Sequence, residues 1–215
     1  MTFTYTLTCT LDTTTALPPV AGSEEQRAYW VTPTILAWPL SLLPRGMDRE
    51  VVVTDAGDPL PGSGLALRLI TAPDGGAAAI HGRILGADGM PAPTVTPLRI
   101  IGNLPDEVLA AHPHLEGYIA LSATDAAGTP LLDDAAVASA LTGQVAIAQY
   151  VGLPDPTEAA DVSGAHLDAF TGVQTAILLD HLYAEAATRA ELGVTFTGGL
   201  PSFALWAPTA QAVTL

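Results

Sequence analysis

The feature that most constrains the fold is the frequency with which Pro and Gly interrupt the chain between residues 27 and 178. Only short extended runs remain between these interruptions, and turn-forming segments such as 57–59 and 73–76 separate them. The runs are 28–32, 35–38, 50–54, 65–71, 95–101, 117–123, 144–151 and 169–177. Many short strands divided by turns of this kind are typical of an antiparallel β-sandwich. We therefore predict a mainly-β fold, with one β-sandwich domain over residues 26–178.

Helical patterns are few. Residues 105–112 and 133–141 each carry acidic residues near their start, which is typical of short helices. Residues 177–192 predict a longer helix, because apolar side chains recur along one stripe and Gly193 follows as a stop. Glu185 and Arg189 lie in the favourable i,i+4 order on this helix. We assign residues 179–193 to a linker helix.

The segment after this helix has the pattern of an unfinished β-structure. Strands are expected at 194–197, 202–207 and 211–215, with turns at 198–199 and 208–209. Two or three short strands are marginally stable alone and expose a pairing edge. We therefore interpret residues 194–215 as the first strands of a second, truncated β-sandwich module.

The N-terminal 25 residues differ from the rest. Residues 2–11 alternate Thr with apolar or aromatic side chains, which is the period of a half-buried strand. Residues 12–25 are rich in Thr, Pro, Gly, Ser and Glu, a composition typical of a linker. We assign residues 1–25 to an N-terminal strand and linker.

The charge of the chain excludes some classes of partner. Its 215 residues include seven Arg, no Lys and 22 acidic residues, for a formal net charge of −15. Such a surface repels phosphate backbones and anionic lipids, so we expect neither a nucleic acid nor a membrane as partner. The N-terminus has no basic region followed by an apolar stretch, so no signal peptide is expected. The compartment is left open, because this interpretation holds only if Met1 is the true start.

Polar residues that resemble catalytic or metal-binding groups have structural explanations. Asp133 and Asp134 are adjacent at an expected helix start, where carboxylates cap the helix; the two carboxyls of a retaining glycosidase instead face each other at about 5 Å. His112 and His114 resemble a metal pair, but no third ligand is evident and Cys9 is the single cysteine. We therefore assign no catalytic residue, no metal ligand and no cofactor.

Aromatic side chains are the stronger candidates for binding. Flat Trp and Tyr rings stack on the C–H face of a sugar when they are exposed. Tyr29, Trp30 and Trp38 are the candidate carbohydrate-binding residues, and Tyr29 and Trp30 point to opposite faces of an expected strand. The alternative is that both Trp side chains fill the core.

Several segments of the sequence resemble a known family. The segment 179–187, LDHLYAEAA, followed by 202–213, SFALWAPTAQAV, is similar to type I pullulanases. Upstream, AYWV at 28–31 and ILAWP at 35–39 resemble the opening of the N2 domain of that family, and GQVAIAQY at 143–150 resembles its middle. The resemblance covers about residues 26–215. His181 departs from the family, which often has an acidic residue there.

The resemblance implies an N2-type β-sandwich, a linker helix and the first strands of a module of the glycogen-branching and isoamylase type (CBM48). In this family a catalytic barrel that follows this module hydrolyses α-1,6-glucosidic linkages in pullulan and branched starch. The expected role of this chain is therefore noncatalytic: it supports domain packing and glucan positioning. The implied partners are the downstream CBM48 module, the catalytic barrel and a branched α-glucan. Two alternatives remain, an autonomous starch-binding module and a purely structural spacer.

Overall fold

Strands form most of the regular structure of the chain. The computed structural model describes residues 20–22, 25–47, 64–72, 93–152 and 166–214. The strands are β1 (Ala28–Thr32), β2 (Ile35–Pro39), β3 (Leu65–Ala72), β4 (Thr94–Asn103), β5 (Tyr118–Ser122), β6 (Gln144–Val151), β7 (His166–Gln174), β8 (Gly193–Thr197) and β9 (Leu200–Ala204). The helices are α2 (Asp106–Ala111), α3 (Asp134–Leu141) and α4 (Ala176–Arg189), with 3-10 turns η1 (Leu40–Leu42) and η4 (Pro113–Leu115).

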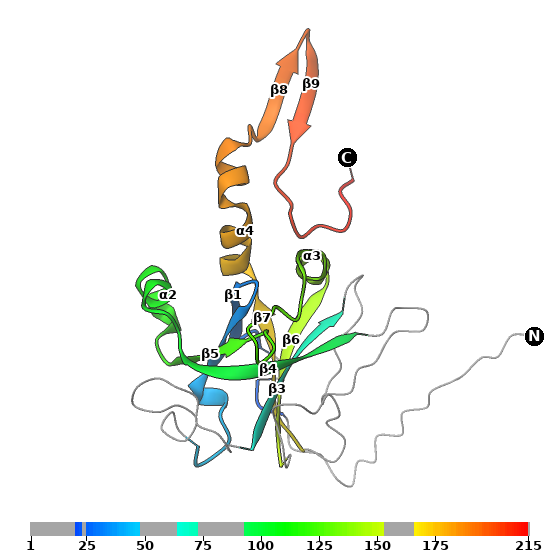
Figure 1. The fold of residues 1–215 in the computed structure, drawn as a ribbon. Helices are drawn as coiled ribbons and strands as arrows, with labels where there is room; N and C mark the ends of the chain where they lie inside the picture. Colours follow the sequence, from blue (N-terminus) through cyan, green and yellow to red (C-terminus); the bar gives the residue numbers. More distant parts are fainter. Residues whose placement is uncertain (1–19, 23–24, 48–63, 73–92, 153–165, 215) are drawn as a thin grey trace, which may run out of the picture.

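Seven of these strands close into a barrel in the order β1-β2-β5-β4-β3-β6-β7 (Figure 1). Every pairing is antiparallel except the one that closes the barrel, where β1 runs parallel to β7. The seam is short, with Ala28 opposite Val173 and Tyr29 opposite Gln174. A parallel seam is possible here because the two strands are far apart in the sequence and are not joined by a tight turn.

The barrel closes because β4 takes part in both halves of the sheet. Its first residues pair with β3 and its last residues pair with β5. Within the part that pairs with β5, the register shifts at a bulge after Ile100, and Gly102 adopts a φ of 109°. A bulge bends a strand and increases its twist, and a positive φ suits Gly because it has no Cβ. The mainly-β prediction is confirmed, and the expected sandwich takes the form of a closed barrel.

Alternating side chains fill the barrel interior. Leu67, Leu69 and Ile147 point inward with Trp30 and Trp38, and all five are almost completely buried. Full burial of each aliphatic side chain contributes about 1.5–3 kcal/mol before the entropy of ordering it is subtracted. The interior is therefore a packed core.

A buried carboxamide, that of Gln149, also lies in this interior. Gln149 accepts a hydrogen bond from Trp38 Nε1 at 3.0 Å. Its own amide nitrogen donates to the Leu42 carbonyl oxygen at 2.8 Å and to Asp168 Oδ2 at 2.9 Å. Buried polar atoms need hydrogen-bond partners of this kind. Here the partners come from different elements, so the network joins β2, η1, β6 and β7.

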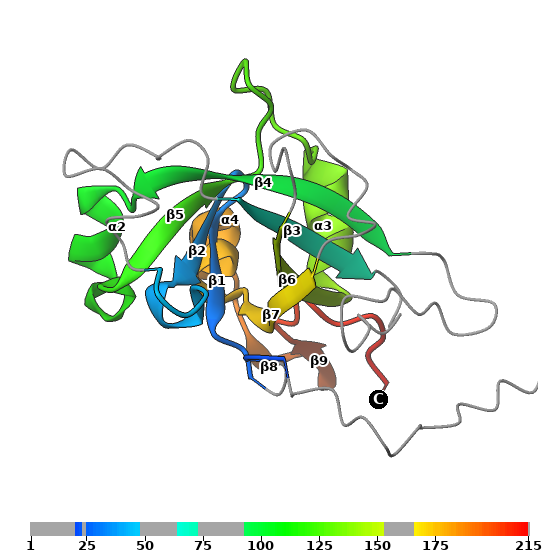
Figure 2. The ribbon, with the colours of Figure 1, turned by 90° about the horizontal axis from the view of Figure 1, so that it is seen from below.

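Helices cover one outer face of the barrel. Val31, Ala37 and Ala120 on β1, β2 and β5 pack against Leu115 of η4 and Ile177 of α4. Figure 2 shows α2 beside β5, and α4 seen along its axis next to β1 and β2. The helix starts differ only slightly from the predicted ones at residues 105, 133 and 177.

An arm projects from this barrel. Helix α4 leads away from the strands and continues into the hairpin β8–β9, and the chain then turns back toward α3 (Figure 1). The strand expected at 202–207 is instead β9, which is shifted toward the turn, and residues 211–214 are not a strand. None of the helices in the described ranges is long and apolar enough to span a membrane. The expected strands at 2–11 and 50–54 lie outside the described residues.

Candidate functional site

The two predicted Trp residues lie in the core. Trp30 and Trp38 are each 0% exposed and point into the barrel. A ring without an accessible face cannot stack on a sugar, so we correct the expectation for these two side chains and retain only Tyr29 as a candidate. The correction has a simple physical cause: β1 and β2 each have one face inside a closed barrel, and large apolar rings fill that space.

Tyr29 points to the outer face and belongs to a cluster of aromatic rings. Its ring centroid lies 5.2 Å from that of His114 on η4 and 5.6 Å from that of Tyr118 on β5. Strand β2 pairs with β1 on one side and with β5 on the other. Only one strand therefore separates Tyr118 on β5 from Tyr29. We call Tyr29, Tyr118 and His114 the aromatic cluster. Its two Tyr rings are partly exposed and His114 is exposed.

The environment of this cluster favours uncharged side chains. Burial raises the pKa of the Tyr118 hydroxyl, and the neighbouring Tyr29 raises it further, while Arg27 lowers it by a smaller amount. The Tyr118 phenol therefore remains a neutral hydrogen-bonding group beside apolar ring faces. This chemistry suits a neutral ligand with hydroxyl groups.

His112 and His114 lie close together, with ring centroids 5.9 Å apart. Among the described residues, no group of three His, Cys, Asp or Glu side chains is arranged to hold a metal ion. The neighbours of His114 are the rings of Tyr29 and His112, so its ring packing belongs to the aromatic cluster.

Asp133 and Asp134 mark the start of α3. Asp133 Oδ1 accepts a hydrogen bond from the Ala136 backbone nitrogen at 2.8 Å, and Asp134 occupies the first turn. The carboxylates therefore cap the helix and complement its dipole, as the sequence predicts.

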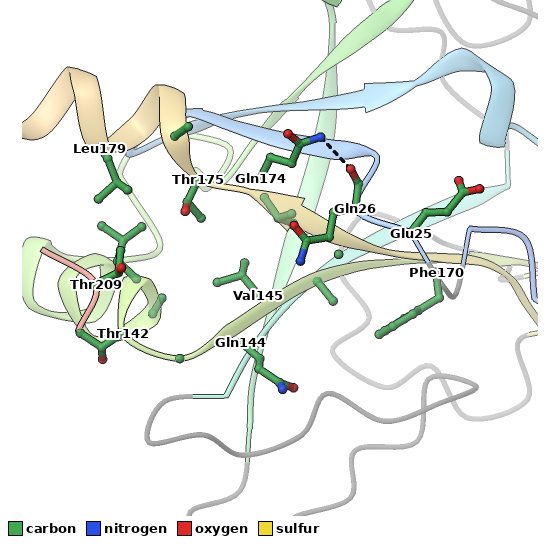
Figure 3. A pocket seen from close by; sticks show the side chains of 17 residues that line it. Glu25, Gln26, Thr142, Gln144, Val145, Phe170, Gln174, Thr175, Leu179 and Thr209 are labelled. Atoms are coloured by element: carbon green, nitrogen blue, oxygen red, sulfur yellow. Dashed lines mark hydrogen bonds between the residues drawn. The ribbon is translucent and has the colours of Figure 1, made fainter. Parts of the chain in front are cut away.

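A cleft of about 790 Å³ lies where α3, α4 and the strands β6 and β7 meet (Figure 3). Its walls also include the segment before β1 and Thr209, which follows the β8–β9 hairpin. Three of its polar side chains are glutamines from separate elements: Gln26 before β1, Gln144 on β6 and Gln174 on β7. We call this the glutamine cleft.

Sequence reasoning did not identify the glutamine cleft. Its glutamines are separated by 118 and 30 positions, and each has the sequence context of an ordinary solvated residue at the edge of an element. They come together only because β7 pairs with β6 on one side and with β1 on the other. No local pattern predicts that closure.

Comparisons with known proteins agree with this architecture. Residues 25–181 match the family described as the pullulanase N2 domain. A search of curated proteins found no match.

Solved structures of pullulanases are similar to this chain. They include PulA from Klebsiella pneumoniae in complex with maltotriose, which is 26% identical to this chain, covers 89% of it and has a TM-score of 0.53. Apo pullulanase from K. pneumoniae matches at 26% identity over 89% with a TM-score of 0.52, and PulA from Klebsiella oxytoca at 27% over 90% with a TM-score of 0.50. The similar region is 15%, 15% and 14% of those chains, respectively. With a family match over most of its length and a barrel that aligns with these structures, the chain belongs to the pullulanase N2 domain family.

Proposed function

We propose that this chain is the noncatalytic N-terminal region of a pullulanase-like debranching enzyme, in which it packs against downstream modules and helps to position a branched α-glucan. The observation that carries the proposal is the arm formed by α4 and the hairpin β8–β9. This arm connects a closed barrel to a hairpin whose ten residues are all exposed.

The two faces of the hairpin differ in polarity. The register places Val194 opposite Phe203 and Phe196 opposite Pro201, so these four side chains share one face. Thr195 and Thr197 lie on the other face. Phe196 is 71% exposed and Phe203 is 58% exposed. A two-stranded hairpin with one apolar face gains stability when that face packs on another layer. The proposed layer is the remainder of the CBM48-type module, followed by the catalytic barrel that hydrolyses α-1,6 linkages.

The test uses the parent enzyme and this chain in parallel. Phe196→Ser removes an apolar side chain from the hairpin face, whereas Thr195→Ser changes the opposite face of the same strand. In the parent enzyme we expect Phe196→Ser to lower the thermal midpoint and Thr195→Ser to leave it unchanged. In this chain alone neither change should alter the midpoint, because Phe196 is exposed. Equal midpoints for the parent enzyme and its Phe196→Ser variant would contradict the proposed packing.

The aromatic cluster supports the second candidate, an autonomous starch-binding module. Tyr29 and Tyr118 are partly exposed on the outer face of the barrel, and their rings contact each other. This function predicts retardation of the chain in gels containing pullulan or amylopectin, and loss of that retardation in Tyr29→Ala. No retardation of the wild-type chain would exclude the module.

A purely structural spacer makes a different prediction. Deletion of residues 25–181 from the parent enzyme would then lower its stability but leave the KM for pullulan unchanged. An increase in KM would instead support a role in glucan positioning.

A further inference from the structure

The glutamine cleft is large enough to hold a small ligand. Its volume of about 790 Å³ lies within the range of about 300–1,000 Å³ that is common for small-molecule sites. Apolar residues, including Val145 and Leu179, line it together with the glutamines and with Thr142, Thr175 and Thr209. Polar atoms make up the larger part of its exposed lining, so hydrogen bonds would dominate the binding of a ligand there.

The charge of the lining selects the class of ligand. No Arg or His lies among the lining residues, and Glu25 is the only carboxylate there. Glu25 is paired with Arg27, with its Oε2 3.2 Å from Arg27 Nε. Carboxamides and hydroxyls both donate and accept hydrogen bonds, and they match ligands that do the same. The chain has a net charge of −15, so it would also repel an anionic ligand. The chemistry therefore favours a neutral molecule rich in hydroxyl groups.

The wall that holds Gln26 is fixed by hydrogen bonds. Gly172 N donates to the Glu25 carbonyl oxygen at 2.9 Å, and Arg27 N donates to Thr171 Oγ1 at 3.0 Å. Gln174 Nε2 donates to the Gln26 carbonyl oxygen at 2.7 Å, which is the dashed line in Figure 3. The Gln26 carboxamide itself is left directed into the cleft, toward the side of Val145 (Figure 3). A site that is rigid before binding loses less entropy when the ligand arrives.

Gly172 provides the space for this arrangement. A Cβ built at position 172 would lie 2.8 Å from Gln26 Cγ. The absence of a side chain on this part of β7 therefore lets Gln26 lie directly over the strand.

The cleft also touches the segment that follows the hairpin. Thr209 forms part of its wall, and Gln211 Nε2 donates to the Thr142 carbonyl oxygen at 2.6 Å. Trp206 makes an edge contact with Tyr183 of α4, at a centroid distance of 6.0 Å. A ligand in the cleft would thus contact the barrel and the segment after the hairpin at the same time.

We propose that the glutamine cleft binds a short neutral oligosaccharide, with the Gln26 carboxamide as its central hydrogen-bonding group, and that the bound sugar holds the segment around Thr209 against the barrel. The choice of an α-glucan as the sugar rests on the proposed function. The cleft is separate from the aromatic cluster, since no residue of that cluster lines it.

Maltotriose is the probe, and cellotriose is the control of the same composition with different linkage. Titration of the full chain is followed by calorimetry and by Trp fluorescence, in which Trp206 is the exposed reporter because Trp30 and Trp38 are buried. We expect saturable maltotriose binding with a change in fluorescence, and weaker binding of cellotriose. Gln26→Leu keeps the approximate volume but removes the carboxamide, and it should weaken binding roughly tenfold.

Two further variants make the result specific. Gly172→Ala displaces Gln26 while the carboxamide remains, and it should weaken binding in the same direction. Glu107→Gln, on α2 outside both the cleft and the aromatic cluster, should leave maltotriose affinity unchanged. Urea unfolding of each variant confirms that a folded protein is being compared.

The proposal is overturned if the wild-type chain shows no saturable binding at millimolar maltotriose. It is also overturned if Gln26→Leu and Gly172→Ala bind like wild type, or if Tyr29→Ala alone abolishes binding, which would place the sugar on the aromatic cluster. None of these results alters the thermal midpoint of the parent enzyme carrying Phe196→Ser. Failure of the cleft and failure of the packing role are therefore distinguishable.

Discussion

Gln149 is a buried carboxamide whose hydrogen bonds connect four elements of the barrel. Replacement by Leu keeps a side chain of similar size but leaves the Trp38 indole nitrogen and the Leu42 carbonyl oxygen without this partner. Each buried polar group left unpaired costs about 1–3 kcal/mol. Two such groups lead us to expect that Gln149→Leu lowers the free energy of unfolding by about 2–6 kcal/mol, as measured by urea denaturation.

Gln211→Leu is the matched control for this change. Gln211 is exposed and donates one hydrogen bond to the Thr142 carbonyl oxygen. Water can replace that bond, so the free energy of unfolding should change by less than about 0.5 kcal/mol. Similar losses for the two variants would show that burial of the Gln149 network has no special importance.

Asp125 organises the turn that follows β5. Its Oδ1 accepts hydrogen bonds from the backbone nitrogens of Thr129, at 2.8 Å, and Ala127, at 2.9 Å. These bonds, led by the one from Thr129, hold the pKa of the carboxyl below its usual value. Because the folded pKa is lower than the unfolded one, the carboxylate stabilises the fold above the unfolded pKa. That contribution is lost as the pH falls through the folded pKa.

A carbon-detected NMR titration of the Asp125 carboxyl measures this shift directly. We expect a midpoint below that of the same residue in urea, and we expect Asp125→Ala to remove part of the acid dependence of unfolding. A midpoint equal to that of the unfolded chain would contradict the assigned hydrogen bonds.

At the start of helix α3, the stabilising effect of an N-cap can be measured separately from that of a charge near the helix dipole. Asp133 caps the helix by accepting from the Ala136 nitrogen, whereas Asp134 lies one residue later, in the first turn. Loss of an N-cap typically costs about 0.5–2 kcal/mol, and a charge near the helix dipole contributes about 0.3–1 kcal/mol. Asp133→Ala should therefore destabilise the chain more than Asp134→Ala in thermal unfolding, and Asp133→Ser should recover most of the difference. The reverse order of Asp133→Ala and Asp134→Ala would show that the cap is not effective.

Most elements of the barrel could be predicted from local pattern. The strand expected at 144–151 is β6 itself, and the expected helix at 133–141 differs from α3 by one residue. These segments are marked by turns and caps that act within a few residues. The second strand of the hairpin is displaced relative to its prediction, because the strand expected to start at Ser202 begins at Leu200, directly after the glycine turn.

The site was harder to predict than the elements. Alternation shows that Tyr29 and Trp30 face opposite sides of β1, but it does not say which side is inside the barrel. That choice depends on closure of β1 against β7, between residues more than 140 positions apart. The meeting of Gln26 with Gln174 depends on the same closure.

At the level of the whole molecule, the closed barrel and the projecting hairpin β8–β9 depend on different contacts. The barrel needs the bulge in β4 and the short parallel seam between β1 and β7, and its stability comes from side chains that are buried inside it. The hairpin β8–β9 pairs only with itself among the described strands. We therefore expect the barrel to fold without this hairpin.

This division predicts the result of removing residues 191–215. Helix α4 would keep its packing on the barrel through Ile177 and Leu178, which are buried near its start. The truncation would remove the Tyr183–Trp206 ring pair and the exposed hydrogen bond of Gln211. Such a ring pair is worth about 0.5–1.5 kcal/mol, so the free energy of unfolding in urea should fall by no more than about 2 kcal/mol.

The same truncation removes the most exposed apolar side chains of the described chain, including Phe196, Leu200 and Leu205. Binding of a dye that reports exposed apolar surface should therefore decrease, although the barrel remains folded. A loss of cooperative unfolding, or dye binding that rises, would show that the hairpin belongs to the folding unit of the barrel. Retained cooperativity with reduced dye binding is the result expected if the hairpin is a docking element whose apolar face is meant for a neighbouring module.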